Sequence, residues 1–277
     1  MTDYTLKETP PVNHKDKYEI ELADWILLEK AAIALIHITG TLWYDKSVEL
    51  VLFRNQLFDR SASEILSLHQ YAKDVVKKPI NAIDTLLLVK ELNKLDLAPS
   101  RIDIGRLGAE WIAEKKNYKN AEEFINDKMR DFIGKEKRKI IPRAVVLYGF
   151  GRIGRLVMRE LVVQAGKGEQ LRLRAIVTRS YSDEDLTKRA DLLRNDSVHG
   201  PFPGTVIEDF EKKALIVNGH TVHMIAAKNP DEVDYTAYGI SNALLIDNTG
   251  VSRDREGLSK HLKSKGVGKV FEIPYAV

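Results

Sequence analysis

The chain has 277 residues, of which 44% are hydrophobic, so it can bury a large core and form about two domains, and a disordered or fibrous class is excluded. Lys and Arg number 43 against 40 Asp and Glu, a balance that argues against a nucleic-acid-binding field over the whole surface. The absence of cysteine excludes disulfides, thiolate zinc sites and a cysteine nucleophile within these residues.

The sequence also gives no sign of a membrane protein. No uninterrupted apolar run approaches the roughly 18 residues of a membrane span. The first 21 residues contain no apolar segment of the signal-peptide type. We therefore expect a cytoplasmic protein whose partners include no membrane and no specific nucleic acid.

Residues 1–135 read as an all-helical domain with few glycines. Apolar side chains recur at steps of three and four residues, as between Ile65 and Val76, which is typical of an amphipathic helix. Ser61 and Asn120 each stand three residues before a glutamate, a spacing that caps a helix N-terminus. The pattern predicts helices over residues 22–37, 45–58, 61–77, 80–95, 101–116 and 120–133, with breaks at Gly40, Pro79 and Pro99.

Two further features of this half have structural explanations. Trp25, Trp43 and Trp111 are expected to fill a core rather than a ligand pocket. The basic residues around 136–142 are expected to form a solvated linker, although a nucleic-acid patch is the alternative.

Residues 143–277 begin with a strand, a glycine loop and a helix. Ala144–Tyr148 is a short apolar run typical of a buried parallel strand, and residues 149–154 then spell G-x-G-x-x-G before a helical pattern from Arg155 to Gln164. This order favours a Rossmann-type α/β domain that binds a dinucleotide.

Each glycine of the loop has a steric reason. Gly149 permits the tight turn, Gly151 lets the backbone approach a pyrophosphate, and Gly154 lets the helix pack closely on the strand. The amides of Arg152 and Ile153, which follow Phe150 and Gly151, open the helix and are expected to face the anion.

A second strand, Leu171–Val177, arrives about 20 residues after the glycines, where an NAD-specific site carries an acidic residue for the ribose hydroxyls. Here Thr178, Arg179 and Ser180 follow instead. We expect Thr178 and Arg179 to bind the cofactor. With no carboxylate and the Arg179 guanidinium at this position, a 2′-phosphate is expected to be tolerated, so the cofactor is NADP or NAD.

At this point residues 148–155, YGFGRIGR, resemble the nucleotide loop of the glyceraldehyde-3-phosphate dehydrogenase family, which typically reads NGFGRIGR. Three further segments resemble that family in the same order: Arg194–Gly200, Leu215–Gly219 and Asp247–Val251. The resemblance implies that Thr249 and Gly250 lie beside the nicotinamide ribose. Asn248 and Ser252 depart from the family pattern, and Val177–Thr178 replaces its usual Asn-Asp pair, so strict NAD preference is not expected.

The resemblance begins near residue 143 and ends at residues 273–277, about where the family's nucleotide domain meets its catalytic half. The family's cysteine nucleophile, in a Ser-Cys-Thr-Thr-Asn segment, is missing, so we assign no catalytic residue and expect this chain alone to be inactive. Larger bacterial members carry a helical extension like residues 1–140. Family members are commonly tetramers, yet much of that interface would belong to the missing half, so a homo-oligomer is predicted only weakly.

Three functions are consistent with these residues. The chain is the cofactor-binding portion of a phosphorylating glyceraldehyde-3-phosphate dehydrogenase, or a noncatalytic dinucleotide-binding regulatory or interaction protein, or part of an erythrose-4-phosphate dehydrogenase.

The histidines are not expected to take part in catalysis or metal binding. His199 is expected to make a structural hydrogen bond, and His220 and His223 have an odd separation that points them to opposite faces of a strand. We expect no metal site.

Overall fold

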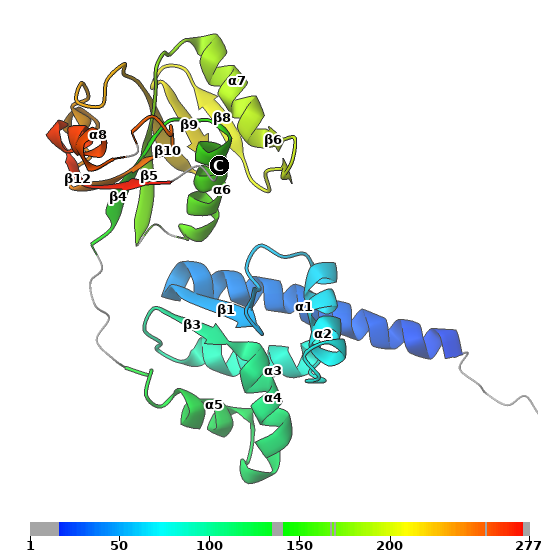
Figure 1. The fold of residues 1–277 in the computed structure, drawn as a ribbon. Helices are drawn as coiled ribbons and strands as arrows, with labels where there is room; N and C mark the ends of the chain where they lie inside the picture. The colour runs from blue at the N-terminus through cyan, green and yellow to red at the C-terminus, as the bar shows by residue number, and fades with distance from the viewer. Residues whose placement is uncertain (1–16, 135–140, 167, 169, 253, 274–277) are drawn as a thin grey trace, which may run out of the picture. The chain divides into compact units, whose positions relative to one another are not determined.

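In the computed structural model, the chain divides into two compact units, Met1–Lys137 and Arg138–Val277 (Figure 1). The expected linker at 136–142 falls largely outside the described residues. The structure describes residues 17–134, 141–166, 168, 170–252 and 254–273.

The first unit combines helices with a small sheet. Its strand order is β2-β1-β3, with β1 antiparallel to β2 and parallel to β3. The elements are α1 (Lys17–Lys46), β1 (Val48–Leu52), β2 (Asn55–Gln56), α2 (Ala62–Asp74), α3 (Ala82–Lys94), β3 (Ser100–Asp103), α4 (Ile104–Glu114), the 3₁₀ turn η1 (Lys115–Asn117) and α5 (Ala121–Met129).

The sheet corrects the expectation that this unit is all helical. The segment predicted as a helix over 45–58 is instead β1, a turn and β2. Phe53 and Arg54 in the turn have φ of 47° and 74°, which no α-helix contains. The pairing of β1 with β3 joins segments about 50 residues apart, and a local helical period cannot reveal such a contact.

The caps at Ser61 and Asn120 form as predicted. The Ser61 side chain accepts a hydrogen bond from the Glu64 amide while the Glu64 carboxylate accepts from the Ser61 amide, and Asn120 caps α5 through the Glu123 amide. The predicted break at Gly40 is wrong, because α1 runs through it. A single helix-interior glycine costs only about 1 kcal/mol.

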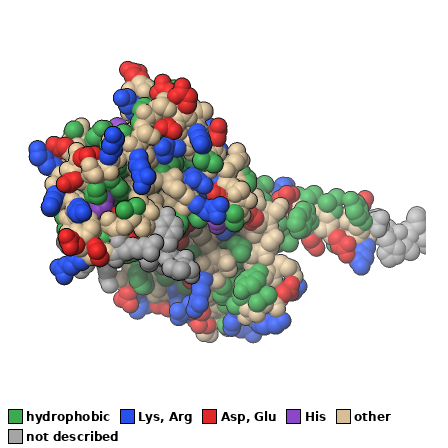
Figure 2. All heavy atoms as spheres, turned by 45° about the horizontal axis from the view of Figure 1, so that its top comes forward, with side chains coloured by type: hydrophobic (Ala, Val, Ile, Leu, Met, Phe, Trp, Pro, Cys, Tyr) green, Lys and Arg blue, Asp and Glu red, His purple; other side chains and the backbone are tan. Residues whose placement is uncertain are grey.

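Helix α1 is unusual among the described elements. Its C-terminal half packs Ala31, Ala32, Leu35 and Leu42 into the core, whereas residues 17–27 are exposed and carry hydrophobic side chains on the surface (Figure 2). An 18-residue window of α1 has a mean hydropathy of 1.4, so the helix is long and apolar enough to cross a membrane by length and composition. The charged pair Glu29–Lys30 divides this stretch, which is why no continuous run was visible in the sequence. Core helices pass the same test, so this is weak support for a membrane span.

The second unit is built on a seven-stranded sheet in the order β12-β11-β4-β5-β10-β9-β8. The first five strands in this order are parallel to one another, and β9 pairs antiparallel with β10 on one side and with β8 on the other. The main elements are β4 (Arg143–Tyr148), α6 (Arg152–Gln164), β5 (Leu171–Thr178), α7 (Asp183–Arg194), β8 (Val206–Asp209), β9 (Ala214–Val217), β10 (His220–Ala226), β11 (Ala243–Asp247) and β12 (Val267–Glu272). The shorter ones are β6 (Asn195–Asp196), β7 (Gly200–Pro201), η2 (Tyr235–Tyr238), α8 (Arg255–Ser259) and η3 (Lys260–Lys263).

The sheet buries both of its faces. Val145 and Leu147 of β4 join one hydrophobic cluster with α6 and α7, while Val146 between them joins a second cluster with Tyr235. Successive parallel strands joined through helices give the Rossmann-type arrangement that the glycine loop predicted, so the mixed α/β fold class is confirmed.

Candidate functional site

A cavity of about 370 Å³ lies at the carboxyl ends of β4, β5, β10 and β11. Strand order reverses here, because β5 lies on one side of β4 and β11 on the other, and this is where open α/β sheets bind ligands. The lining residues are Tyr148, Gly149, Phe150, Gly151, Val177, Thr178, Arg179, Ser180, Arg189, Ala227, Lys228, Pro230, Asp247, Thr249, Val251 and Ser252.

The glycine loop is shaped so that side chains are excluded at two positions. Gly149 has φ of 100°, and a Cβ there would lie 2.9 Å from Thr249 Cγ2. A Cβ on Gly154 would lie 2.7 Å from Asn248 Oδ1 and 2.8 Å from the Gly149 carbonyl oxygen. The absence of a Cβ at these two glycines therefore lets β4, α6 and the end of β11 pack closely together.

Gly151 differs from the other two glycines. A Cβ at this position would meet no atom within 4 Å, and the residue lines the cavity. Gly151 is also the N-cap of α6, so the amides of Arg152 and Ile153 belong to the first turn, where the helix provides no acceptor. Open space beside free donors fits a pyrophosphate, so the residues present suit a dinucleotide.

Positively charged side chains from three parts of the second unit line the cavity. Thr178 is buried and its hydroxyl donates to the Ser180 carbonyl at 2.8 Å, whereas Arg179 is exposed. Arg189 on α7 and Lys228 after β10 line the same cavity. Cations from three separate elements thus meet around one space.

The end of β11 is held by a buried carboxylate. Asp247 is 2% exposed; its Oδ2 lies 3.1 Å from His261 Nε2, and its Oδ1 accepts from the Thr249 amide at 2.8 Å and hydroxyl at 2.7 Å. Burial raises the pKa of Asp247, but these hydrogen bonds outweigh burial and lower it. The ring of Tyr148 packs edge-on against His261, with centroids 4.6 Å apart. The Thr249 hydroxyl is thus engaged in fixing the loop that lines the cavity.

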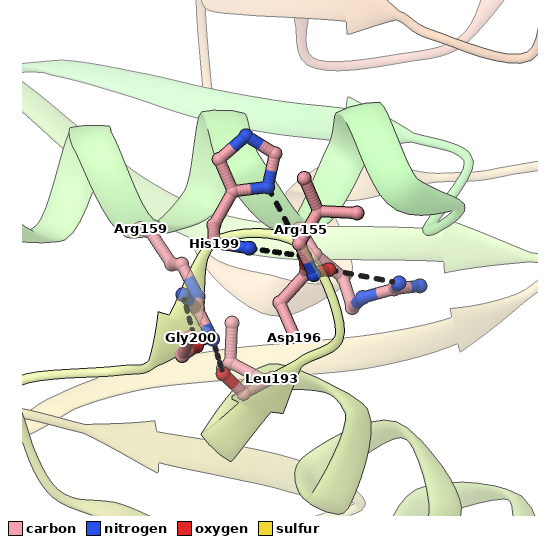
Figure 3. Close-up of polar contacts among 7 residues, drawn as sticks. Arg155, Arg159, Leu193, Asp196, His199 and Gly200 are labelled. Atoms are coloured by element: carbon pink, nitrogen blue, oxygen red, sulfur yellow. Dashed lines mark hydrogen bonds and ion pairs between the residues drawn. The ribbon is translucent and has the colours of Figure 1, made fainter.

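A second polar network lies beneath α6 (Figure 3). Asp196 accepts from the amides of Val198 and His199, both at 3.0 Å, and lies 3.1 Å from His199 Nδ1 and 3.4 Å from the Arg155 guanidinium. These contacts, the backbone amides first, hold the pKa of Asp196 well below its usual range. His199 therefore makes the structural contact that the sequence suggested, and it does not line the cavity.

Arg159, one turn after Arg155, completes this support. Its guanidinium donates to the carbonyls of Leu193 and Gly200 (Figure 3). It also lies over the Phe202 ring, 5.6 Å from the ring centroid. Two arginines on one face of α6 thus tie the helix to the turn after α7, which keeps the α6 N-terminus in place.

The predicted site residues divide into two groups. The cavity is lined by Gly149, Phe150, Gly151, Thr178, Arg179 and Thr249. Arg152, Ile153 and Gly154, in the first turn of α6, and Gly250, next to Thr249, are not among the lining residues. Sequence reasoning missed Arg189 and Lys228, which belong to no motif and reach the cavity only through the packing of α7 and β10. Among the described residues, no group of three or more His, Cys, Asp or Glu side chains is placed to hold a metal ion.

Comparison with known proteins agrees with this geometry. Residues 143–255 match the family model described as the NAD-binding domain of glyceraldehyde 3-phosphate dehydrogenase. The segment is thus similar to a nucleotide-binding domain of the glyceraldehyde-3-phosphate dehydrogenase family. Domains of this family bind NAD or NADP, and the family is one of oxidoreductases.

The similar proteins match different lengths of this chain. A glyceraldehyde-3-phosphate dehydrogenase-like protein of Pseudomonas aeruginosa is 40% identical over 239 residues, which cover 85% of this chain and 52% of that protein. This match is longer than the second unit, so it includes much of the first. Glyceraldehyde-3-phosphate dehydrogenases of Thermotoga maritima and of a second P. aeruginosa strain are 36% identical over 130 and 127 residues, which are 46% of this chain and 35% of each enzyme. The chain thus spans about half the length of the first relative and about a third of the other two.

Proposed function

We propose that this chain is the cofactor-binding portion of a phosphorylating glyceraldehyde-3-phosphate dehydrogenase acting in cytoplasmic glycolysis or gluconeogenesis. The observation that supports this most is the cavity in which the glycine loop after β4 faces the ends of β5 and β11 within a domain of that family. Bound NAD or NADP supplies the hydride acceptor for aldehyde oxidation.

We assign the residues to parts of the cofactor. The amides of Arg152 and Ile153 bind the pyrophosphate, which approaches over Gly151 and Phe150 while Gly149 and Gly154 hold the loop. Thr178 and Arg179 bind the adenosine ribose, and the Arg179 guanidinium donates hydrogen bonds to a 2′-phosphate. Thr249 and Gly250 lie beside the nicotinamide ribose.

The domains have separate tasks in this proposal. Residues 143–277 hold the cofactor, residues 136–142 form a basic linker, and residues 1–135 form an N-terminal domain of the kind shared with the P. aeruginosa dehydrogenase-like protein. The 277 residues contain no cysteine, and an acyl-enzyme thioester requires a thiolate, so this chain alone has no aldehyde dehydrogenase activity.

Calorimetric titration of the purified chain with NADP and NAD tests the cofactor site. We expect binding of at least one, and loss of binding in Gly151→Val, because the new side chain enters the open space beside the α6 amides. Retained far-UV circular dichroism is the control for folding. Unchanged affinity in Gly151→Val would contradict the assigned pyrophosphate position.

A fusion tests the enzyme assignment. The chain is joined to the part of the P. aeruginosa dehydrogenase-like protein that lies beyond the matched region, and NADP and NAD reduction is followed with phosphate and either glyceraldehyde 3-phosphate or erythrose 4-phosphate. Activity only in the fusion is the expected result, and the better substrate separates the two dehydrogenases. A nucleotide-binding but inactive fusion would instead favour a noncatalytic regulatory or interaction protein.

A further inference from the structure

We propose that Arg179 and Arg189 together form a subsite for the phosphomonoester on the adenosine 2′-oxygen, and that Arg189 determines preference for NADP. This inference rests on the proposed dinucleotide site. It adds a residue that no motif marks, from a helix outside the glycine loop.

Arg189 reaches the cavity because of its position on α7. Leu186, Ala190 and Leu193 are fully buried against the sheet, and Arg189 lies next to Ala190 at the border of that buried face. It is half-buried and lines the cavity, whereas its neighbour Lys188 is exposed and does not. The helix therefore places one cation of this adjacent pair at the cavity.

The two arginines are uncompensated within the described part of the chain. Neither Arg179 nor Arg189 has an ion pair or a hydrogen bond there, in contrast with Arg194, which binds Glu208 bidentately and also contacts Asp191. Two free guanidinium groups at one cavity repel each other, and an anion between them removes that repulsion. The site is therefore prepared for negative charge.

The carboxylates near the cavity are engaged in other contacts, including Asp247, which lines the cavity but binds Thr249 and His261. The first turn of α7 carries Asp183, Glu184 and Asp185, yet none of them lines the cavity. Asp185 accepts from the Ser180 hydroxyl at 3.2 Å, and Asp183 accepts from the Tyr181 hydroxyl at 3.2 Å. Their charge lowers the positive potential around the loop without replacing the guanidinium groups that line the space.

The position selects a 2′-phosphate rather than another anion. In a dinucleotide-binding sheet the adenosine ribose lies at the end of the second strand, which is β5 here. The pyrophosphate is assigned to the α6 N-terminus, so the cations beyond β5 are left for a second phosphate. A dianionic phosphomonoester offers several acceptor oxygens, and planar guanidinium groups from two elements can bind it at the same time. Lys228 adds a third positive charge at the same cavity.

The test compares 2′,5′-ADP with 5′-AMP, which differ only by the 2′-phosphate, using calorimetry on the full chain. We expect the wild-type chain to bind 2′,5′-ADP more tightly. Arg189→Ala should weaken 2′,5′-ADP binding by about 10-fold to 100-fold and leave 5′-AMP binding nearly unchanged, because only a charge-assisted contact to the 2′-phosphate is lost.

Lys188→Ala is the matched control. This substitution removes one positive charge from the adjacent residue of the same helix, so it reproduces the long-range electrostatic effect of losing Arg189. Because Lys188 does not line the cavity, the preference for 2′,5′-ADP should remain largely intact. Arg189→Lys keeps the charge but loses the planar fork, and an intermediate affinity is expected. Circular dichroism of each variant establishes that α7 is folded.

Each other outcome overturns a defined part of the proposal. Equal weakening of both nucleotides in Arg189→Ala would place Arg189 at the adenine or the 5′-phosphate. Equal binding of both nucleotides by the wild-type chain, with NAD still bound, would remove the subsite and leave the dinucleotide site standing. Failure of NAD, NADP and both mononucleotides to bind would overturn the proposed function together with this inference.

Discussion

The two units use their polar groups in different ways. In the first unit, buried His69 is bound within the core, where it contacts the Ile65 carbonyl at 2.8 Å and the Thr85 hydroxyl at 2.9 Å. The first unit has a hollow of about 650 Å³ beside η1 and α5, and two of the carboxylates that line it already accept hydrogen bonds. Glu123 accepts from the Lys119 amide, and Asp127 accepts from the Tyr118 hydroxyl.

In the second unit, by contrast, the cavity of about 370 Å³ is bordered by amides of a helix N-terminus and by Arg179 and Arg189, which have no ion pair or hydrogen bond among the described residues. Parallel strands end together, so their loops bring groups from distant parts of the sequence to one edge. Because unpaired donors attract an anion, we expect the second unit rather than the first to bind a nucleotide, although its cavity is smaller. Loss of stability and loss of binding should therefore be separable between the units.

The largest effect is expected from Phe124→Ala in the first unit. Phe124 is fully buried and packs against Trp111 and Tyr118, each with ring centroids 5.2 Å apart, so truncation should lower the free energy of unfolding by about 3–5 kcal/mol. Urea unfolding followed by tryptophan fluorescence measures this, since all three tryptophans lie in the first unit. Nucleotide affinity should not change. A parallel loss of affinity would show that the units are energetically coupled.

Gly154→Ala should produce the opposite pattern. Its Cβ would overlap Asn248 Oδ1 and the Gly149 carbonyl oxygen, so α6 must shift, at about 1–3 kcal/mol, and nucleotide binding should fall. Hydrogen exchange of β4 amides and calorimetric titration measure the two effects. Gly40→Ala is the matched control, because a Cβ there meets nothing within 4 Å in α1, and it should stabilise the first unit by up to about 1 kcal/mol. Undiminished binding in Gly154→Ala would argue against close helix-to-strand packing as a requirement of the site.

The smallest effect concerns acid sensitivity of the first unit. Burial lowers the pKa of His69 below its ordinary value of 6.5. The unfolded chain therefore binds more protons as the pH falls through 6.5, and the first unit should lose stability there until the lower folded pKa is reached. His69→Gln should flatten this dependence when tryptophan-detected urea unfolding is compared between neutral pH and about pH 5. A wild-type chain with no loss of stability over that range would show that His69 is not held neutral.

The sequence predicted the glycine loop because each of its constraints is local. A short apolar strand, three glycines and a helix follow one another within residues 144–164, and steric rules connect each glycine to its backbone position. Capping at Ser61 and Asn120 was predictable for the same reason, since cap and amide are three residues apart.

The small sheet of the first unit was not predictable in this way. Asp103 shows why: one oxygen of its carboxylate accepts from the Arg106 amide to cap α4 and also from the Phe53 amide, 50 residues earlier, to fix the turn between β1 and β2. A capping residue is visible in the sequence, but its second partner depends on the parallel pairing of β1 with β3.

The same division applies to the cavity. Local sequence by itself determined the glycine turn, the missing carboxylate after β5 and the presence of Arg179, because these depend on backbone sterics and on residues a fixed distance along the chain. Only the tertiary structure brought Arg189 and Lys228 to the same space and buried Asp247 against His261. The physical reason is that helix packing and parallel strand pairing, both nonlocal, decide which side chains share one edge of the sheet.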